Sequence, residues 1–266
     1  MKSASSDVLA VGGPVGQQNG WKVASCYVSG SRHQQQGQNC QDRAGSFVAG
    51  PVAAIAVSDG AGSAVAAEVG SAVAVRTALL SVLALHRSVC AVTAENASKI
   101  VWFGFQHAQK QLSYEAAARG LTLKDLACTL ILVVAGPDFV CAGHAGDGAV
   151  VLVNQDDKLI TLSKPTNGEF ANETALLCCD PNLKVNISRL DGIRPKALAV
   201  FTDGLQRLAL SLPAHEPHPG FFLPLFRLLE GLTEAEANQL LFDFLNSARV
   251  SGRSDDDRTL ATAILE

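Results

Sequence analysis

The chain has no cluster of lysine and arginine residues, and its 21 basic residues are outnumbered by 25 acidic ones, which gives a formal net charge of −4. Proteins that bind nucleic acid or an anionic membrane surface concentrate positive charge at the contact. The sequence therefore predicts no nucleic acid and no membrane among its partners.

The N-terminus lacks the order of an export signal, in which basic residues precede an apolar segment. Residues 1–20 are rich in Ser, Gly and Gln, and we expect them to form a flexible tail before a single domain at 21–266. Polar residues interrupt the longest apolar stretches before they reach the roughly 20 residues that cross a bilayer. We therefore expect a cytoplasmic protein.

The cysteines do not suggest a disulfide framework, because there are seven of them at irregular spacing. Most lie inside apolar runs, where a free thiol packs as a small hydrophobic group. The adjacent pair Cys178-Cys179 has no basic residue beside it that would activate a thiol, so we expect it to be inert. Reduced thiols agree with a cytosolic compartment.

The most informative pattern in the sequence is an apolar run that ends in an aspartate, usually followed by glycine. Its five occurrences are centred on Asp42, Asp59, Asp147, Asp203 and Asp256. An Asp-Gly pair alone is a common turn, and we expect Asp191-Gly192 to be only that. Carboxylates that end separate strands also have a second use, since they can gather around a divalent cation.

Apolar periodicity predicts the order of the elements. Strands at 21–28 and 46–57, the second interrupted by a turn at Gly50-Pro51, precede helices at 64–86 and 93–119. Six strand signals follow between 127 and 201, then helical patterns at 205–212, 220–230 and 233–250 and a last strand at 259–265. Closely spaced strands without intervening helices favour antiparallel sheets. The order predicts one α+β domain in which helices cover a sandwich.

Asp59 and Asp203 follow sequences typical of buried strands, and a charge at the end of a buried strand is costly unless it is paired. No His/Cys spacing typical of a zinc site accompanies them, and aspartates with a backbone carbonyl and water suit Mg²⁺ or Mn²⁺. The carboxylates exceed what one octahedral ion needs, so we expect two ions that share a bridging aspartate. Two such ions lower the pKa of a water between them and allow in-line hydrolysis of a phosphate ester. Calcium or a purely structural ion stays open as an alternative.

Five motifs occur in a specific order: Gln-Asp, Ser-Asp-Gly-Ala-Gly-Ser, Gly-His-Ala-Gly-Asp-Gly, Phe-Thr-Asp-Gly-Leu and Ser-Asp-Asp-Asp-Arg-Thr. Over residues 21–265 the chain resembles the metal-dependent protein serine/threonine phosphatases of the 2C type, in a bacterial subgroup. The resemblance implies a four-layer αββα sandwich, in which two antiparallel sheets are flanked by antiparallel helix pairs. It also implies hydrolysis of phosphoserine and phosphothreonine in proteins, with phosphorylated proteins and a cognate serine/threonine kinase as partners.

The resemblance assigns roles to individual residues. Asp59 matches the carboxylate that bridges the two metal ions, and the carbonyl of Gly60 matches a ligand of the second ion. Asp203 and Asp256 complete the first ion's ligands, while Asp42 lies at the second ion, directly or through water. Asp42, Asp59, Asp203 and Asp256 are thus the expected catalytic residues.

Two further aspartates occupy positions with a less definite role. Asp147 matches the position that binds a third, weaker ion in some members, and an ordinary hairpin turn is the equal alternative. Asp257 stands where relatives carry Asn or Asp beside the last metal ligand.

The chain departs from the family pattern at two positions. Many relatives have an arginine that binds the substrate phosphate where this chain has Gly37, and many eukaryotic members have a histidine where it has Ala61. We expect Arg32 and His33 to bind substrate instead, with a water or His33 as the acid. Arg43 and Arg258 are weaker candidates for the phosphate.

Two alternative functions stay open, and these departures motivate the first. The first is a catalytically weak or silent phosphoprotein-binding regulatory domain, although the retained carboxylates argue against it. The second is hydrolysis of a small phosphorylated metabolite by the same metals.

Overall fold

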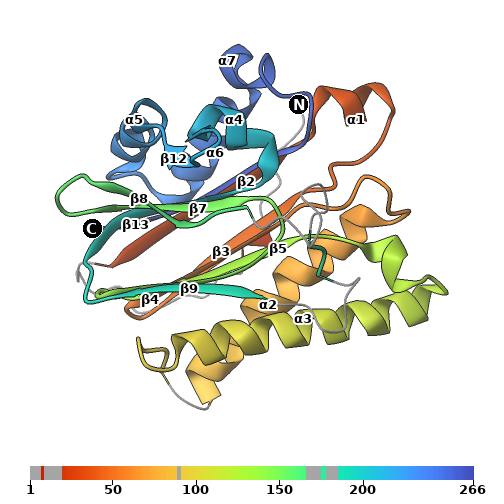
Figure 1. Ribbon diagram of the computed structural model, residues 1–266, viewed down its shortest axis with the longest axis horizontal. Coiled ribbons are helices and arrows are strands. Elements are labelled where there is room, and N and C mark those ends of the chain that lie inside the picture. Colours follow the sequence, from red (N-terminus) through yellow and green to blue (C-terminus); the bar gives the residue numbers. More distant parts are fainter. Residues whose placement is uncertain (1–6, 9–19, 89–90, 166–174, 178–184) are drawn as a thin grey trace.

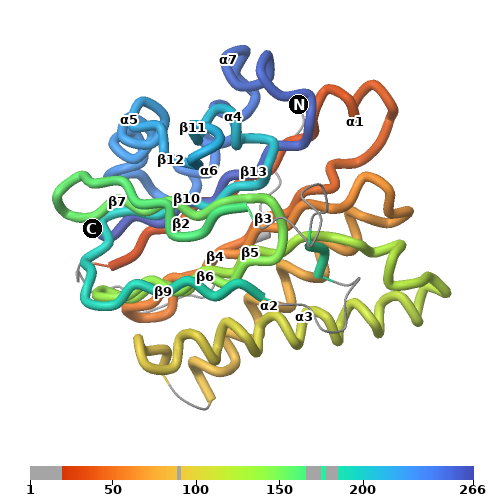
Figure 2. The backbone as a smooth tube through the Cα atoms, viewed as in Figure 1, coloured from red at the N-terminus to blue at the C-terminus, as the bar shows by residue number. Residues whose placement is uncertain are grey.

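The computed structural model describes residues 7–8, 20–88, 91–165, 175–177 and 185–266. Its elements form four layers, in which two sheets pack face to face and helices cover the outer face of each sheet (Figure 1). The backbone trace shows the same layers without the ribbons (Figure 2). The predicted α+β sandwich is therefore confirmed.

The first sheet has six strands in the order β1-β3-β4-β5-β6-β9. Their bounds are Asp7–Val8, Arg43–Ala49, Val52–Ser58, Leu130–Ala135, Phe139–Ala145 and Asn186–Asp191. Neighbours pair antiparallel except β1, which pairs in parallel with β3. This edge differs from the wholly antiparallel sheet that we expected, and it places two residues of the expected tail beside the sheet.

The second sheet has five strands in the order β2-β13-β10-β7-β8, and all neighbours pair antiparallel. In that order their bounds are Trp21–Val28, Arg258–Leu265, Pro195–Phe201, Ala149–Asn154 and Leu159–Ser163. Neighbours in this sheet come from distant parts of the sequence, so the first and last strands of the domain lie side by side.

Strand β5 shows why the sequence signals were continuous apolar runs. Ile131 and Val133 face the space between the two sheets, whereas Leu130, Leu132 and Val134 face the helices on the outer side. Side chains alternate between the faces of a strand, and both faces of this strand are covered. All of its residues are consequently buried.

Two long helices cover the first sheet, α2 at Ala67–Ser88 and α3 at Ala97–Arg119. They contact each other, and α3 ends at Gly120, whose φ of 66° allows the left-handed conformation that closes a helix. By length and hydropathy α2 is long and apolar enough to cross a membrane. Its inner side packs against the first sheet and α3, as the core helix of a folded domain does.

The second sheet is covered by α5 at Pro219–Leu229 and α6 at Glu234–Asn246, together with the shorter helices α4 at Gln206–Ala209 and α7 at Ala248–Ser251. A capping box fixes the start of α6, since Thr233 N donates to Glu236 Oε2 at 2.9 Å. The expected single helix at 233–250 is wrong, because Ser247 takes an extended conformation between α6 and α7.

The helix expected at 205–212 is also wrong. A 3₁₀ turn, η2 at Asp203–Leu205, leads into α4, and the chain then forms a short hairpin of β11 at Leu210–Ser211 and β12 at Glu216–Pro217. The residue before a proline is disfavoured in helical conformation, so Pro213 prevents the helix from continuing through Leu212.

Two short helices lie where the sequence suggested loops. Helix α1 at Ser31–Gln35 follows β2, and the 3₁₀ helix η1 at Leu123–Leu126 follows α3. The start of η1 is fixed by a capping box between Thr122 and Asp125. Helix α1 leads into the segment that carries Asp42, and η1 leads through Thr129 into β5.

The core between the sheets provides a test of this packing. Leu152 on β7 is fully buried there, so Leu152→Ala should lower the free energy of unfolding by about 2–5 kcal/mol. Val65 is 77% exposed, and Val65→Ala should change stability by less than about 0.5 kcal/mol. Urea unfolding of both variants gives the comparison, and equal losses would contradict the assigned core.

Candidate metal centre

The aspartates gather at one end of the sandwich because of the register of the strands. In the first sheet, Arg43 at the start of β3 pairs with Ser58 at the end of β4. Asp42 and Asp59, the next residues outward on the two strands, are therefore neighbours. A long-range pairing of antiparallel strands thus brings together two motifs that the sequence separates.

The second sheet contributes in the same way. Phe201, the last residue of β10, pairs with Leu260 near the start of β13. Asp203 and Asp256 therefore emerge at the same end. Asp147 lies between β6 and β7, which belong to different sheets, so the chain crosses from one sheet to the other at this residue.

Three of the carboxylates approach most closely. Asp59, Asp147 and Asp203 each offer an oxygen atom, and these atoms lie within 4.8 Å of one another. Together with Asp256 and Gly60 they line a cavity of about 490 Å³. Carboxylate oxygens at this spacing suit a hard divalent cation that keeps some of its waters. The residues present therefore fit Mn²⁺ or Mg²⁺.

Asp42 lies beneath this cavity and is 1% exposed. Its Oδ2 atom accepts hydrogen bonds from the hydroxyls of Thr202 and Thr259, both at 2.7 Å. Its Oδ1 atom is buried without a hydrogen-bond donor among the described residues. A buried oxygen without a partner is costly, and a cation or a proton shared with Asp59 would supply one.

Burial and mutual repulsion make these carboxylates unusually basic. Burial raises the pKa of Asp42 to about 7. Burial, and then the charges of Asp42 and Asp203, hold the pKa of Asp59 well above its ordinary value. Burial also raises the pKa of Asp203 to about 6, with the charges of Asp147 and Asp256 adding to the effect. Neighbouring negative charges that each disfavour ionisation favour a bound cation.

Asp59 is held by hydrogen bonds to Thr129, which precedes β5. The Asp59 amide donates to Thr129 Oγ1 at 2.8 Å, and the Thr129 amide donates to the Asp59 carbonyl at 2.8 Å. Next to it, Gly60 lies against the start of α2, where a Cβ atom would be 2.7 Å from the Cβ of Ala67. A glycine is therefore required here, because the backbone of the turn that carries Asp59 packs directly on the helix.

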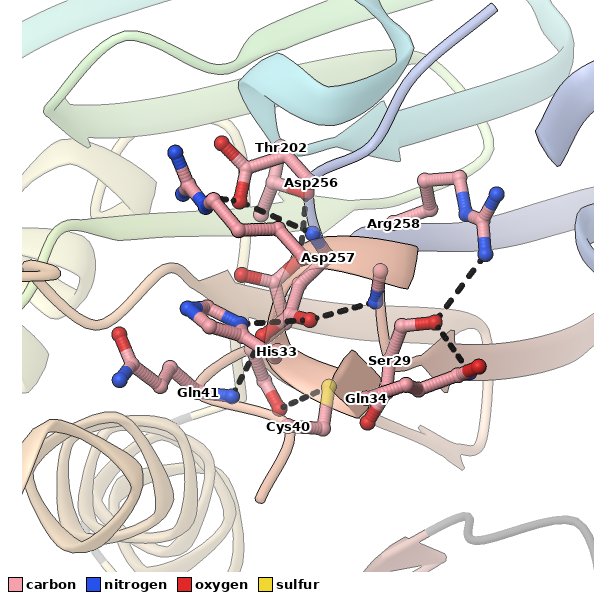
Figure 3. Close-up of polar contacts among 12 residues, drawn as sticks. Ser29, His33, Gln34, Cys40, Gln41, Thr202, Asp256, Asp257 and Arg258 are labelled. Atoms are coloured by element: carbon pink, nitrogen blue, oxygen red, sulfur yellow. Dashed lines mark hydrogen bonds and ion pairs between the residues drawn. The ribbon is translucent and has the colours of Figure 1, made fainter. Parts of the chain in front are cut away.

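Asp257 has a different role from the other aspartates, because its carboxylate holds the segment between β2 and β3 (Figure 3). Its Oδ1 accepts from the amide of Gly30 at 2.7 Å, and its Oδ2 accepts from the amide of Gln41 at 2.6 Å. His33 Nδ1 lies 2.9 Å from Oδ1, and both side chains are nearly inaccessible to water. One buried carboxylate thus fixes both ends of the segment that leads to Asp42.

The structure places the two expected substrate-binding residues, Arg32 and His33, at the wall of the cavity. Arg32 is half exposed, and its Nη2 atom donates to Asp256 Oδ1 at 2.9 Å. His33 is directed toward Asp257 rather than to solvent. Arg32 therefore offers an exposed positive charge beside the carboxylate cluster.

The two weaker phosphate candidates are directed elsewhere. Arg43 donates to the carbonyls of Cys40 and Asp42 at 2.7 Å and lies over the ring of Tyr27. Arg258 is buried and donates to the carbonyl of Ser29 at 3.1 Å. Neither arginine lines the cavity that holds the carboxylates, so neither has the position expected of a phosphate ligand.

Several residues of this centre were missed by the sequence analysis. The clamp formed by Asp257 had no signal beyond its place in the Asp-Asp-Asp run, and nothing distinguished Thr202 and Thr259 as donors to Asp42. His144, in the motif that ends in Asp147-Gly148, is buried, and its Nδ1 lies 2.7 Å from Ser163 Oγ. Cys178 and Cys179 lie outside the described residues.

Comparisons with known proteins agree with this geometry. A family model described as "Protein phosphatase 2C" matches residues 29–246. The chain is similar to serine/threonine-protein phosphatase 3 of Escherichia coli (strain K12), with 36% identity over 163 residues. That match covers 59% of this chain and 62% of the relative, which is less than two thirds of the relative's length.

Solved structures share the fold. The serine/threonine phosphatase Stp1 from Staphylococcus aureus has a TM-score of 0.64 at 15% identity, covering 96% of this chain and 99% of that one. The catalytic domain of the serine/threonine protein phosphatase PstP, solved with two manganese ions, has a TM-score of 0.59 at 15% identity, covering 92% and 98%. At this identity the likeness concerns the fold. The family model matches most of the chain, and that match shows that the chain belongs to the protein phosphatase 2C family.

Proposed function

We propose that this protein hydrolyses phosphoserine and phosphothreonine in proteins, with a water molecule activated by two Mn²⁺ or Mg²⁺ ions. The observation that carries the proposal is the meeting of aspartates from both sheets in one open cavity. Membership of the phosphatase family and the two manganese ions reported for the PstP domain support it. Phosphorylated proteins, and a kinase that produces them, would be its partners in the cytoplasm.

The ligand roles follow from the positions of the aspartates. Asp59 lies centrally, because it is adjacent to Asp42 on the first sheet and shares the tight oxygen cluster with Asp203 from the second. We assign it the bridging role, with the Gly60 carbonyl at the same turn. Asp147 lies in that cluster too, so we assign it a metal ligand's role rather than that of a simple turn. Two bound ions would supply a water of lowered pKa and neutralise phosphoryl oxygens.

Arg32 is our candidate for binding the substrate phosphate. Its guanidinium lies at the cavity wall and is paired with Asp256, a carboxylate that a metal ion would neutralise in its place. Gly37, at the usual family position for the arginine, lines a separate cavity and has no side chain to offer. An exposed guanidinium matches the geometry of a phosphate, which it binds through two parallel hydrogen bonds.

The leaving oxygen requires a proton, which either a water or His33 would supply. His33 lines the cavity, and its Nδ1 atom is engaged with Asp257, which leaves Nε2 as the other ring nitrogen. A histidine fixed in this way by a carboxylate has a defined orientation. Ala61, at the position of the histidine of many relatives, lines the cavity without a group that transfers protons.

The alternative is a regulatory domain that binds phosphoproteins without hydrolysing them. It is favoured by the departures from the family pattern at Gly37 and Ala61. An enzyme is favoured by the close grouping of carboxylates, because burying like charges together costs free energy and a binding domain does not need it. Metal-dependent turnover of para-nitrophenyl phosphate that is lost on chelation would separate the two functions. A faster rate on a phosphothreonine peptide than on small phosphorylated metabolites would identify phosphorylated proteins as the natural class of substrate.

Removal of the bridging charge gives the most direct test. Asp59→Asn should lower kcat for para-nitrophenyl phosphate by more than roughly 100-fold, since even changes one shell away from a metal cost up to that much. Asp138→Asn removes the same charge from an exposed turn and should leave the rate unchanged. Persistence of hydrolysis in Asp59→Asn would defeat the assignment.

Arg32 is tested by the dependence of the rate on substrate concentration. Arg32→Ala should raise KM for a phosphothreonine peptide roughly tenfold or more, because a charge-assisted hydrogen bond to phosphate contributes about 1.5–3 kcal/mol. The Mn²⁺ concentration that gives half-maximal activity serves as a control, since Arg32 also contacts Asp256. A change in that concentration with an unchanged KM would show that Arg32 acts only on the metal centre.

The raised pKa values predict how metal binding depends on pH. In the metal-free protein Asp42, Asp59 and Asp203 hold protons more tightly when folded, so their stabilising contribution is present at about pH 4 and is lost as pH rises toward 7. Mn²⁺ relieves that repulsion. The rise in Tm on adding Mn²⁺ should therefore be larger at about pH 7.5 than at about pH 5. Thermal unfolding at both pH values tests this, and an equal rise would contradict it.

A further inference from the structure

A groove of about 1040 Å³ lies on the outer surface of the helices that cover the second sheet. Helices α4, α5, α6 and α7 line it, and they form one layer of the sandwich (Figure 1). Its apolar residues include Leu208, Phe221, Leu228, Leu232, Leu240 and Phe244. Leu228 is 62% exposed. An apolar groove of this size on a surface is typical of a site for another polypeptide.

Three arginines line the same groove: Arg207, Arg249 and Arg253. All three are exposed, and the described residues provide none of their side chains with a hydrogen bond or an ion pair. The two acidic residues of the groove are already engaged within α6 and its cap, Glu236 with Thr233 and Asp243 with Gln239. These hydrogen bonds come from neutral groups, so both carboxylates keep their charge, and three arginines against two carboxylates leave the lining with a net charge of +1.

The three arginines are concentrated at one end, which also holds Asp243, whereas the other acidic residue, Glu236, lies at the opposite end. Helices α5 and α6 follow each other through a short connection at 230–233, so the start of α5 lies near the end of α6. That end adjoins α4 and α7, which carry Arg207 and Arg249, and Arg253 directly follows α7. The opposite end, near the connection, is formed by Leu228 and Leu232.

The basic end is also the end connected to the metal centre. Arg207 comes four residues after Asp203, and Arg253 comes three residues before Asp256. A segment bound in the groove would thus have its acidic end close to the cavity in which a phosphate is cleaved.

We propose that this groove binds an amphipathic helical segment of the phosphorylated protein substrate, with apolar residues along one face and acidic residues at the end nearest the catalytic cavity. The proposal rests on the proposed phosphatase function and adds to it a source of substrate specificity. Helices bind apolar grooves through residues spaced at i, i+3, i+4 and i+7. The three unpaired arginines select an acidic partner by charge complementarity.

A pair of synthetic peptides tests the groove. Both carry leucines at helical spacing, and one has glutamates at one end where the other has lysines. The glutamate peptide should bind, and the lysine peptide should bind at least about tenfold more weakly in fluorescence anisotropy. Three substitutions should each lower the affinity for the glutamate peptide by about fivefold or more: the charge reversals Arg249→Glu and Arg253→Glu, and Leu228→Glu at the apolar end.

The matched control is Arg227→Glu, because Arg227 is exposed on α5 and lies outside the groove lining. It should change the affinity by less than about twofold. Equal binding of the two peptides, no binding of either, or an equal effect of Arg227→Glu would overturn the proposal. So would a dimer in sedimentation that Leu228→Glu dissociates, or binding to phosphatidylserine vesicles in place of the peptide.

A second measurement links the groove to the cavity. Each peptide is joined to a phosphothreonine peptide through a flexible linker of about 12 residues, which spans roughly 20 Å. The glutamate fusion should show a KM at least about fivefold lower than the lysine fusion with the same kcat, through a raised local concentration. Equal KM values would show that the groove does not serve the catalytic cavity. Peptide binding needs no turnover, so a failure of the phosphatase proposal would appear separately, as absent hydrolysis by the unaltered protein.

Discussion

The structure depends on one electrostatic constraint, which is that five carboxylates share the same end of two packed sheets. Burial, and then repulsion between neighbouring carboxylates, raises the pKa of Asp42, Asp59 and Asp203, so this end opposes folding unless protons or cations are bound there. The hydrophobic layers provide the opposing stabilisation. Apolar side chains fill the space between the sheets and both spaces between sheets and helices.

The carboxylates are held in place by hydrogen bonds from uncharged groups around them, which are threonine side chains and backbone amides. Thr129 fixes the turn of Asp59, and Thr202 and Thr259 fix Asp42 from the second sheet. Asp257 holds the segment between β2 and β3 through two backbone amides. These contacts join segments far apart in the sequence, so the positions of the charged groups are set by the tertiary fold rather than by local turns.

Much of this arrangement was predictable from local patterns. Continuous apolar runs predicted the strands, and an aspartate at the end of a buried run predicted the metal centre, because a charge in that position needs a partner. The register of the strands was not predictable, and it decides that Asp147 joins the closest cluster with Asp59 and Asp203. The Asp257 clamp and the break at Ser247 also depend on tertiary contacts, which leave no periodic signal in the sequence.

Two of the closely spaced carboxylates belong to different sheets, Asp59 at the end of β4 and Asp203 after β10. Any cation held by both is a bridge between the two halves of the sandwich. The fraction of molecules with a bound cation then governs how freely the two sheets separate at that end. Amide hydrogen exchange at the ends of β4 and β10 would therefore become slower as the cation concentration rises. A catalytic cation in this position would therefore also hold the two sheets of the domain together.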